Sequence, residues 1–283
     1  MKISHAVIPL LCAFGLSAAD KEPATVEKLI QEARSAMRSG DEKKALALAA
    51  EAVKLAPNKP EPHVFRGQLH SVIGKHEQSV ADFTMALKLD PKQSIIHQHR
   101  GVAYFKSAKV VESIADFDKY IAANPRSEPE HWQRGISHYY AGEFAKGRKQ
   151  FEVHQTVNPN DVENAVWHFL CVARAETIEK ARAAYIPIKG DTRVPMMEVH
   201  ALFIGKLKPE DVLASANAGD VKGPQLERNL FYAHLYLGLY YEIIGDAEKS
   251  VKYIRLAAAK TEEHGYMGDV ARVHAVLRKI KPE

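Results

Sequence analysis

A spacing of 34 residues recurs along the chain and constrains its fold more than any other feature of the sequence. Three residue types keep this spacing in phase: Pro57, Pro91, Pro125 and Pro159; Gly67, Gly101 and Gly135; and Arg66, Arg100 and Arg134. Regular spacing on this scale indicates a repeat architecture, in which each unit buries its apolar face only by stacking on its neighbours. We therefore expect an array of small units rather than one central core.

The residue types at the repeated positions predict a pair of antiparallel helices in each unit. A glycine has no Cβ atom and lets two helices approach closely, at a cost of about 1 kcal/mol within a helix. Bulky side chains at another repeated position fill the space between the helices, namely Phe83, Phe117 and Phe151. Gly74 and Gly142 permit the left-handed backbone that ends the first helix. The proline ends the second helix, because it has no amide hydrogen and crowds the preceding turn.

This unit resembles the tetratricopeptide repeat, which implies an all-α fold: a right-handed superhelix, or α-solenoid, of antiparallel helix pairs. In this register the repeat array covers residues 26–185, with units 26–59, 60–93, 94–127 and 128–161 and a degenerate unit 162–185. Residues 186–225 break the period and predict an irregular insertion with two short helices, the second of which has Pro209 in its first turn. Residues 226–283 are expected to hold a last repeat, at about 231–264, and a capping helix.

Charged residues at facing positions of the two helices predict ion pairs inside the units. Arg66 faces Asp82, and Arg100 faces Asp116. We interpret both as half-buried structural pairs rather than catalytic groups. The fourth unit has Gln150 at the carboxylate position, so Arg134 is expected to be freer.

The inner surface of such a superhelix is lined by the first helix of each unit, and we expect partners to bind there. Aromatic side chains amid polar groups suit an extended peptide or a partner helix. Some of them could instead pack against neighbouring units or the carboxy-terminal helices, and for Phe105 and Tyr140 the two interpretations are equally open. The candidate groove residues are Arg34, Gln68, Gln98, Val102, Phe105, Lys106, Trp132, Ile136, Tyr139 and Tyr140.

The 14 histidines raise the alternative of a protein that binds a metal ion or haem through histidine. His63, His97 and His131 share the fourth position of their units, where side chains of stacked helices point in parallel, roughly 8–10 Å apart. Parallel imidazoles do not converge on one ion at about 2.0–2.1 Å, so we interpret them as packing residues with a polar tip. The sequence contains no familiar catalytic, metal or cofactor motif, and Cys171 is expected to be buried. We therefore expect no catalysis, no metal and no cofactor.

The first residues resemble an export signal, with Lys2 ahead of an apolar run and small residues at 17–19. We expect cleavage after Ala19, a signal peptide of residues 1–19, and a periplasmic or envelope-associated mature chain without a transmembrane segment. Lipidation at Cys12 is the less favoured interpretation, because Pro9-Leu10-Leu11 precedes it instead of small residues. A formal net charge of only +4 without a long basic run gives no reason to expect a nucleic-acid partner.

The irregular half narrows the resemblance to one family, the bacterial NlpI-like tetratricopeptide lipoproteins. The stretches that carry it are "NPNDVENAVWHFLCVA", "EVHALFIGKLKPEDVLA" and "LERNLFYAHLYLGLYYEIIGDAEKSVKYIRLAA". The resemblance implies a non-catalytic envelope adaptor, often a homodimer, that brings cell-wall hydrolases to an envelope protease or to synthesis complexes. The chain departs from the family in lacking a well-placed lipidation cysteine. A second hypothesis is a periplasmic assembly factor for outer-membrane or pilus components.

Overall fold

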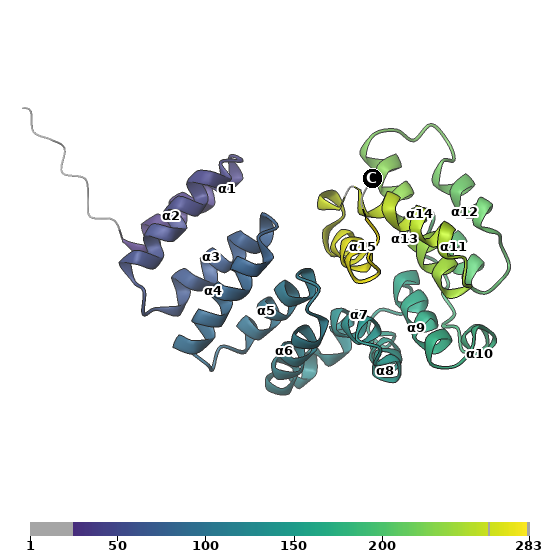
Figure 1. Ribbon diagram of the computed structural model, residues 1–283, viewed down its shortest axis with the longest axis horizontal. Helices are drawn as coiled ribbons and strands as arrows, with labels where there is room; N and C mark the ends of the chain where they lie inside the picture. The colour runs from purple at the N-terminus through teal and green to yellow at the C-terminus, as the bar shows by residue number, and fades with distance from the viewer. Residues whose placement is uncertain (1–24, 260, 282–283) are drawn as a thin grey trace, which may run out of the picture.

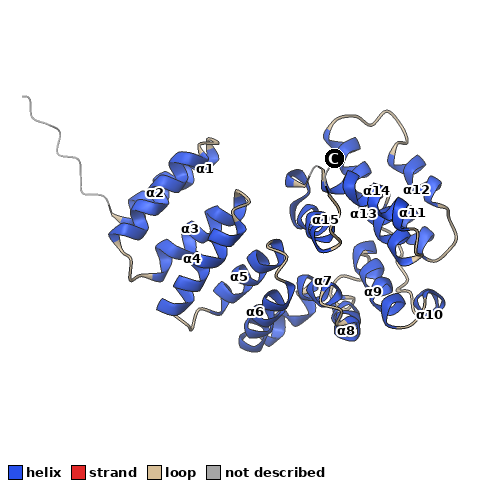
Figure 2. Cartoon of the chain, viewed as in Figure 1, coloured by secondary structure: helices blue, strands red, loops and turns tan. Residues whose placement is uncertain are grey.

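The computed structural model describes residues 25–259 and 261–281, and this part of the chain consists of helices joined by turns, without strands (Figure 1, Figure 2). The expected all-α fold is confirmed. The signal peptide expected at 1–19, with Cys12, lies outside the described residues. Within the described residues, no helix has both the length and the apolar character needed to cross a bilayer.

Four helix pairs follow one another through the first half and form an arc (Figure 1). They are α1 (Val26–Arg38) with α2 (Glu42–Leu55), α3 (Pro60–Val72) with α4 (His76–Leu89), α5 (Ser94–Lys106) with α6 (Val110–Ala123), and α7 (Trp132–Tyr140) with α8 (Phe144–His154). A 3-10 helix, η1 (Pro125–Glu130), takes the place of the first turn in the fourth pair. Consecutive helices therefore alternate between an inner and an outer layer along the arc.

The repeated glycines act as the sequence predicts. A Cβ atom on Gly101 would lie 2.7 Å from the ring of Phe117, and one on Gly67 would lie 2.9 Å from the ring of Phe83. Either contact is closer than carbon atoms tolerate, so only glycine lets the helices of a unit pack this tightly. Gly74, which follows α3, has a φ of +76° and turns the chain back toward the second helix.

The second half contains the largest hydrophobic core of the described residues. Its helices are α9 (Val162–Ala175), α10 (Ile178–Ala183), α11 (Met196–Phe203), α12 (Pro209–Ala216), α13 (Pro224–Ile243) and α14 (Ala247–Ala258). The insertion expected at 186–225 contains α11 and α12, which pack on α9 and α13 and bury Leu202 and Phe203 completely. Cys171 on α9 is likewise buried. The insertion thus fills the space between the array and the last repeat.

The last helix, α15 (Gly265–Leu277), follows the short 3-10 helix η2 (Glu262–His264) and lies on the inner side of the arc, between α14 and α5 (Figure 1). It begins one period after residue 231, the start of the last predicted repeat. Lys279 has a positive φ of 56°, and Gly245 has one of 86° one period earlier. α15 is therefore, in register and geometry, the first helix of a further repeat unit.

Candidate partner-binding surface on the concave face

Buried ion pairs hold the inner helices against the outer ones. Nη2 of Arg66 lies 2.6 Å from Asp82, and Nε of Arg100 lies 2.6 Å from Asp116, so both predicted pairs are confirmed. The carboxylate of Asp82 also accepts a hydrogen bond from His70 at 2.9 Å. Burial alone would raise the pKa of Asp82, but the hydrogen bonds from His70 and Arg66 outweigh it and lower that pKa below its ordinary value. These pairs fix the spacing of the inner surface.

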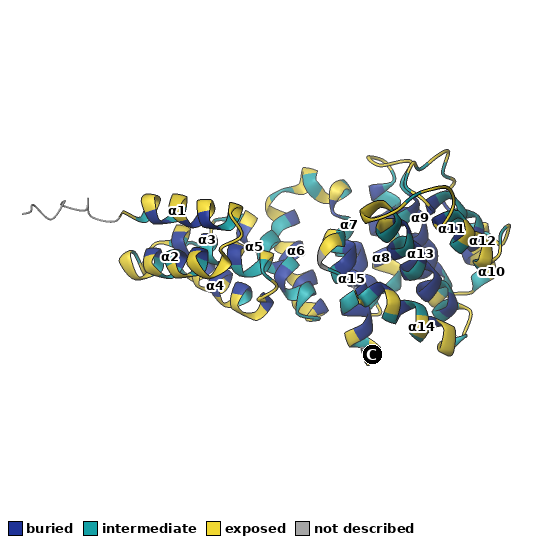
Figure 3. Cartoon of the chain, turned by 90° about the horizontal axis from the view of Figure 1, so that it is seen from above, coloured by how far each residue is buried: buried dark blue, intermediate teal, exposed yellow. Residues whose placement is uncertain are grey.

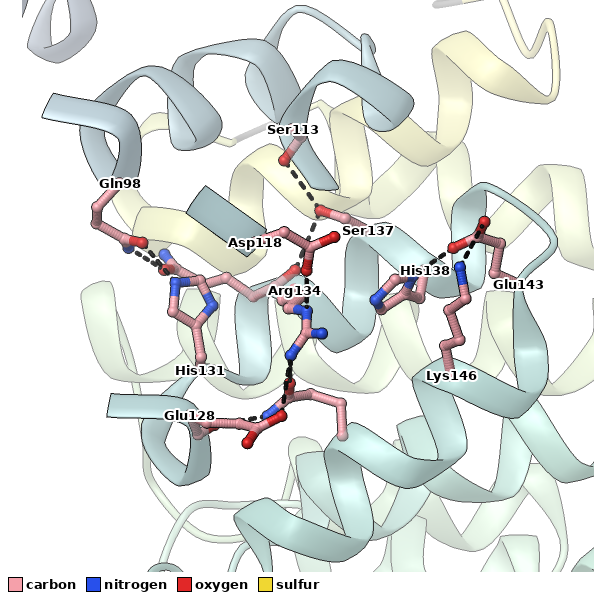
Figure 4. Close-up of polar contacts among 12 residues, drawn as sticks. Gln98, Ser113, Asp118, Glu128, His131, Arg134, Ser137, His138, Glu143 and Lys146 are labelled. Carbon is pink, nitrogen blue, oxygen red and sulfur yellow. Dashed lines mark hydrogen bonds and ion pairs between the residues drawn. The ribbon is translucent and has the colours of Figure 1, made fainter. Parts of the chain in front are cut away.

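Arg134 is not the freer residue that its unit predicts, and that expectation is wrong. Its Nε lies 2.8 Å from Asp118 on α6, and its Nη1 donates to Glu128 in η1 and to Gln150 on α8 (Figure 4). The carboxylate that is missing at position 150 is replaced by Asp118 of the preceding unit and by Glu128 of η1. Arg134 therefore joins three elements where the regular stacking changes.

The repeated histidines bond to groups of the protein. Nε2 of His63 lies 3.0 Å from the carbonyl oxygen of Pro57, and Nδ1 of His97 donates to Asp116 at 2.9 Å. His131 contacts the amide oxygen of Gln98, a candidate groove residue, whose amide nitrogen donates to Gln133 (Figure 4). Throughout the part of the chain that the structure describes, no group of three His, Cys, Asp or Glu side chains is placed to hold a metal ion.

The first two units leave their inner surface uncovered. Arg34 on α1 and Gln68 on α3 are exposed, and the guanidinium of Arg34 lies 5.5 Å from the ring centroid of Phe65. Val72, at the end of α3, is 74% exposed although it is apolar. Val102 on α5 is half-buried. This open stretch is where candidate groove residues are accessible to another molecule.

Beyond the third unit the inner surface is filled by α15. The ring of Tyr266 stacks on Phe105 with centroids 5.2 Å apart and meets Trp132 edge-on at 5.0 Å. Phe105 is completely buried as a result. Phe105 and Trp132, which were expected to bind a partner, thus contact a helix of the same chain.

Deeper candidate residues belong to the core under α15. Ile136 and Tyr139 are almost fully buried. The hydroxyl of Tyr139 donates to Glu242 on α13 at 3.4 Å, and burial raises the pKa of this tyrosine to about 12. The hydroxyl of Tyr140 lies 3.1 Å from Nδ1 of His274 on α15. The two tyrosines thus join the array to α13 and α15.

A polar cluster marks the border between the open and the filled parts. Nζ of Lys106 lies 2.8 Å from Asp269, and Arg272 donates both to Asp269 and to the backbone carbonyl of Lys106. His76 lies 3.8 Å from the same carboxylate. Burial and, after it, the charge of Arg272 lower the pKa of His76 to about 4, against the opposing effect of Asp269. His76 is therefore neutral at pH 7.

A pocket of about 720 Å³ opens at this border. Its walls come from α3, from the end of α5 and from the start of α15, and include Val72, Lys106, Tyr266 and Asp269. The pocket joins the uncovered surface of the first two units to the seated helix. It therefore combines an exposed apolar side chain with both signs of charge.

The sequence contains a signal for the position of α15 on the inner surface. α15 begins in phase with the 34-residue period, and Tyr266 and Asp269 are three residues apart on one helix face. One face of this helix therefore carries both the aromatic and the acidic contact. The period indicates another first helix, but only the structure places it against α5 and α7 as well as α14.

Comparison with solved structures agrees with this architecture. The chain is similar to a tetratricopeptide repeat protein from Parabacteroides merdae ATCC 43184, with a TM-score of 0.58 and 15% identity over 90% of this chain and 98% of that one. It is also similar to PilW, described as a type IV pilus biogenesis factor (TM-score 0.50, 16% identity, 87% and 97%), and to YrrB, described as a TPR protein with an unusual peptide-binding site (TM-score 0.50, 17% identity, 54% and 79%). No family model matches the sequence, and no curated protein does. At these identities the likeness concerns the fold: the chain is a tetratricopeptide-repeat solenoid.

Proposed function

We propose that the protein is a non-catalytic, exported scaffold that binds peptide segments or partner proteins on the open part of its concave face. The observation that carries this proposal is the uncovered inner surface of α1 and α3, next to a pocket of about 720 Å³. Exposed Arg34, Gln68 and Val72 supply a cation, an amide and an apolar contact. This mixture suits an extended segment anchored by one apolar side chain.

The clients are cell-wall hydrolases, which the scaffold holds near an envelope protease or a synthesis complex. This part of the proposal rests on the resemblance of stretches between residues 158 and 258 to the NlpI-like adaptors. Location in the periplasm or at the envelope rests on the signal-like residues 1–19. The description of YrrB as a protein with a peptide-binding site supports peptide recognition by this kind of fold.

A pull-down from envelope extract tests the proposal. The variant Arg34→Glu with Val72→Asp changes two side chains of the open surface, and both are exposed, so the fold is expected to persist. We expect it to lose the partners that the unchanged protein captures. Val111→Asp is the matched control, because Val111 is 67% exposed but lies on the outer helix α6. Capture of the same partners by all three proteins would refute the proposal.

A second candidate function is assembly of outer-membrane or pilus components. The observation that favours it is the likeness to PilW, which extends over 87% of this chain. The same pull-down separates the two functions, since pilus or outer-membrane subunits among the captured proteins favour assembly and a cell-wall hydrolase favours the adaptor.

A further inference from the structure

A second groove lies between α14 and α15, away from the open part of the concave face. Its volume is about 640 Å³. The floor is apolar and is made mostly of small or aliphatic side chains, among which Leu256 is 46% and Val276 55% exposed. The apolar lining consists of Leu256, Ala258, Ala259, Ala275, Val276 and Ile280.

The register of the repeats shows what kind of element fits this groove. The residue at the eighth position of the period lies under the second helix: a Cβ on Gly101 would touch Phe117, and one on Gly238 would lie 2.6 Å from Ile254. The eleventh residue faces the same way, as Tyr241 of α13 does when it stacks on Tyr253 of α14 with centroids 5.7 Å apart.

In α15 the eighth and eleventh positions of the period are Arg272 and Ala275, and both line the groove. The groove thus lies on the side of α15 where the other units hold their second helix, with Arg272 in the place of Gly67, Gly101, Gly135 and Gly238. Among the described residues, no helix follows α15 to cover it.

The charges around the groove indicate the character of that helix. Every charged residue that lines it is basic: Lys252, Arg255, Arg272 and Lys281. Lys252 and Lys281 are exposed. Arg272 directs its guanidinium toward Asp269 and the carbonyl of Lys106, so this side chain lines the groove without presenting its charge to an occupant. An occupant with acidic residues beside an apolar stripe would complement this lining.

We propose that the groove between α14 and α15 binds an amphipathic helix of a partner protein, with acidic residues flanking the apolar face of that helix. The concave shape and the small side chains of Ala258, Ala259 and Ala275 allow a helix to approach closely. Arg272 lies between this groove and the pocket of about 720 Å³, and the site does not depend on the function proposed for the open concave surface.

A peptide taken from an outer helix of this chain provides the probe. Residues 110–123 form α6, which buries one apolar face against α5 and carries three acidic residues and one lysine. Binding of this labelled peptide, acetylated and amidated, to the full chain would be followed by fluorescence anisotropy. The matched control peptide carries Glu112→Lys and Asp118→Lys, which reverse its charge and leave its buried face unchanged.

We expect saturable binding of the acidic peptide and about tenfold weaker binding of the control peptide. The variants Lys252→Glu with Lys281→Glu, and Leu256→Ser with Val276→Ser, should each weaken binding by a similar factor, because all four side chains are exposed and their loss leaves the fold intact. Lys43→Glu with Lys44→Glu, on the exposed start of α2, is the charge control and should bind normally. Arg34→Glu with Val72→Asp should also bind normally, which distinguishes this site from the open concave surface.

Three outcomes would overturn the proposal. The first is an absence of saturable binding, and the second is equal binding by the groove variants. The third is occupation of the groove by something else: binding to phosphatidylglycerol vesicles that Leu256→Ser abolishes would identify a lipid surface, and sedimentation showing a dimer that Leu256→Ser dissociates would identify a second copy of the chain.

Discussion

Asp116 illustrates how strongly one buried carboxylate affects the stability of a small repeat unit. Its side chain is 2% exposed, and it accepts hydrogen bonds from Arg100 and His97. An arginine that loses its partner in such a position remains a buried, uncompensated charge, which is far more costly than the pair itself is stabilising. Even a conservative substitution of the aspartate in the repeated Arg–Asp pair is therefore expected to destabilise the protein strongly.

Asp116→Asn is expected to lower the free energy of unfolding by about 3 kcal/mol. Urea denaturation followed by circular dichroism measures this change. Asp118→Asn is the control, because the Asp118 side chain is 50% exposed in its pair with Arg134 and such pairs contribute roughly 0–1 kcal/mol. Equal losses for the two variants would contradict the argument from burial.

At the scale of elements, Tyr266 is the side chain of α15 that contacts both Phe105 and Trp132 on the inner surface. Tyr266 stacks on Phe105 and meets Trp132 edge-on, while Asp269 pairs with Lys106 at the border. Removing the ring would leave Phe105 and Trp132 facing a cavity that the rest of the helix does not fill. The position of α15 should therefore depend on Tyr266 more than on its ion pair.

Tyr266→Ala is expected to release α15 and expose Trp132 to water. Tryptophan emission should shift to longer wavelength, and amide hydrogens of residues 265–277 should exchange faster, while α1 to α4 keep their exchange rates. Val276→Ala, at a 55% exposed position of the same helix, should change neither measurement. Unchanged emission in Tyr266→Ala would show that other contacts hold the helix.

The sequence predicted the elements and missed their long-range assembly for a physical reason. Helix pairs, glycine contacts and Arg–Asp pairs repeat every 34 residues, so local spacing determines them. Arg134 reaches Asp118 of the preceding unit, and Tyr266 reaches Phe105 across most of the chain, and neither contact follows from the spacing within a unit. Of the two interpretations left open for Phe105 and Tyr140, the structure shows packing against a carboxy-terminal helix, α15, and the spacing alone could not decide between them.

At the scale of the whole molecule, burial is uneven along the chain. Exposed residues are frequent on α1 to α4, whereas buried residues dominate α9 and α13 (Figure 3). Buried histidines occur in both parts. Burial is the main reason that the pKa values of His76, His131 and His274 fall to about 4. All three are neutral in the folded protein at pH 7.

Stability should therefore decrease as the pH falls from about 6.5 to about 4. In this range the unfolded chain binds protons at these histidines and the folded chain does not, so each proton bound favours unfolding. Urea denaturation at pH 7.5 and pH 5 measures the effect. His274→Gln should reduce the pH dependence by about one proton, whatever its effect at pH 7.5. A slope unchanged by this substitution would show that His274 is protonated in the folded state.

The position of α15 against α5 and α7 also determines when the inner surface becomes complete during synthesis of the chain. Arg272 donates to the carbonyl of Lys106 across 166 positions of sequence, whereas the helix pairs of the array join residues within single units. Contacts of such long range close large loops and form after local ones. A growing chain therefore presents Phe105 and Trp132 without their contact to Tyr266 from the time the fourth unit folds until residues 265–277 emerge, so this aromatic surface is covered late.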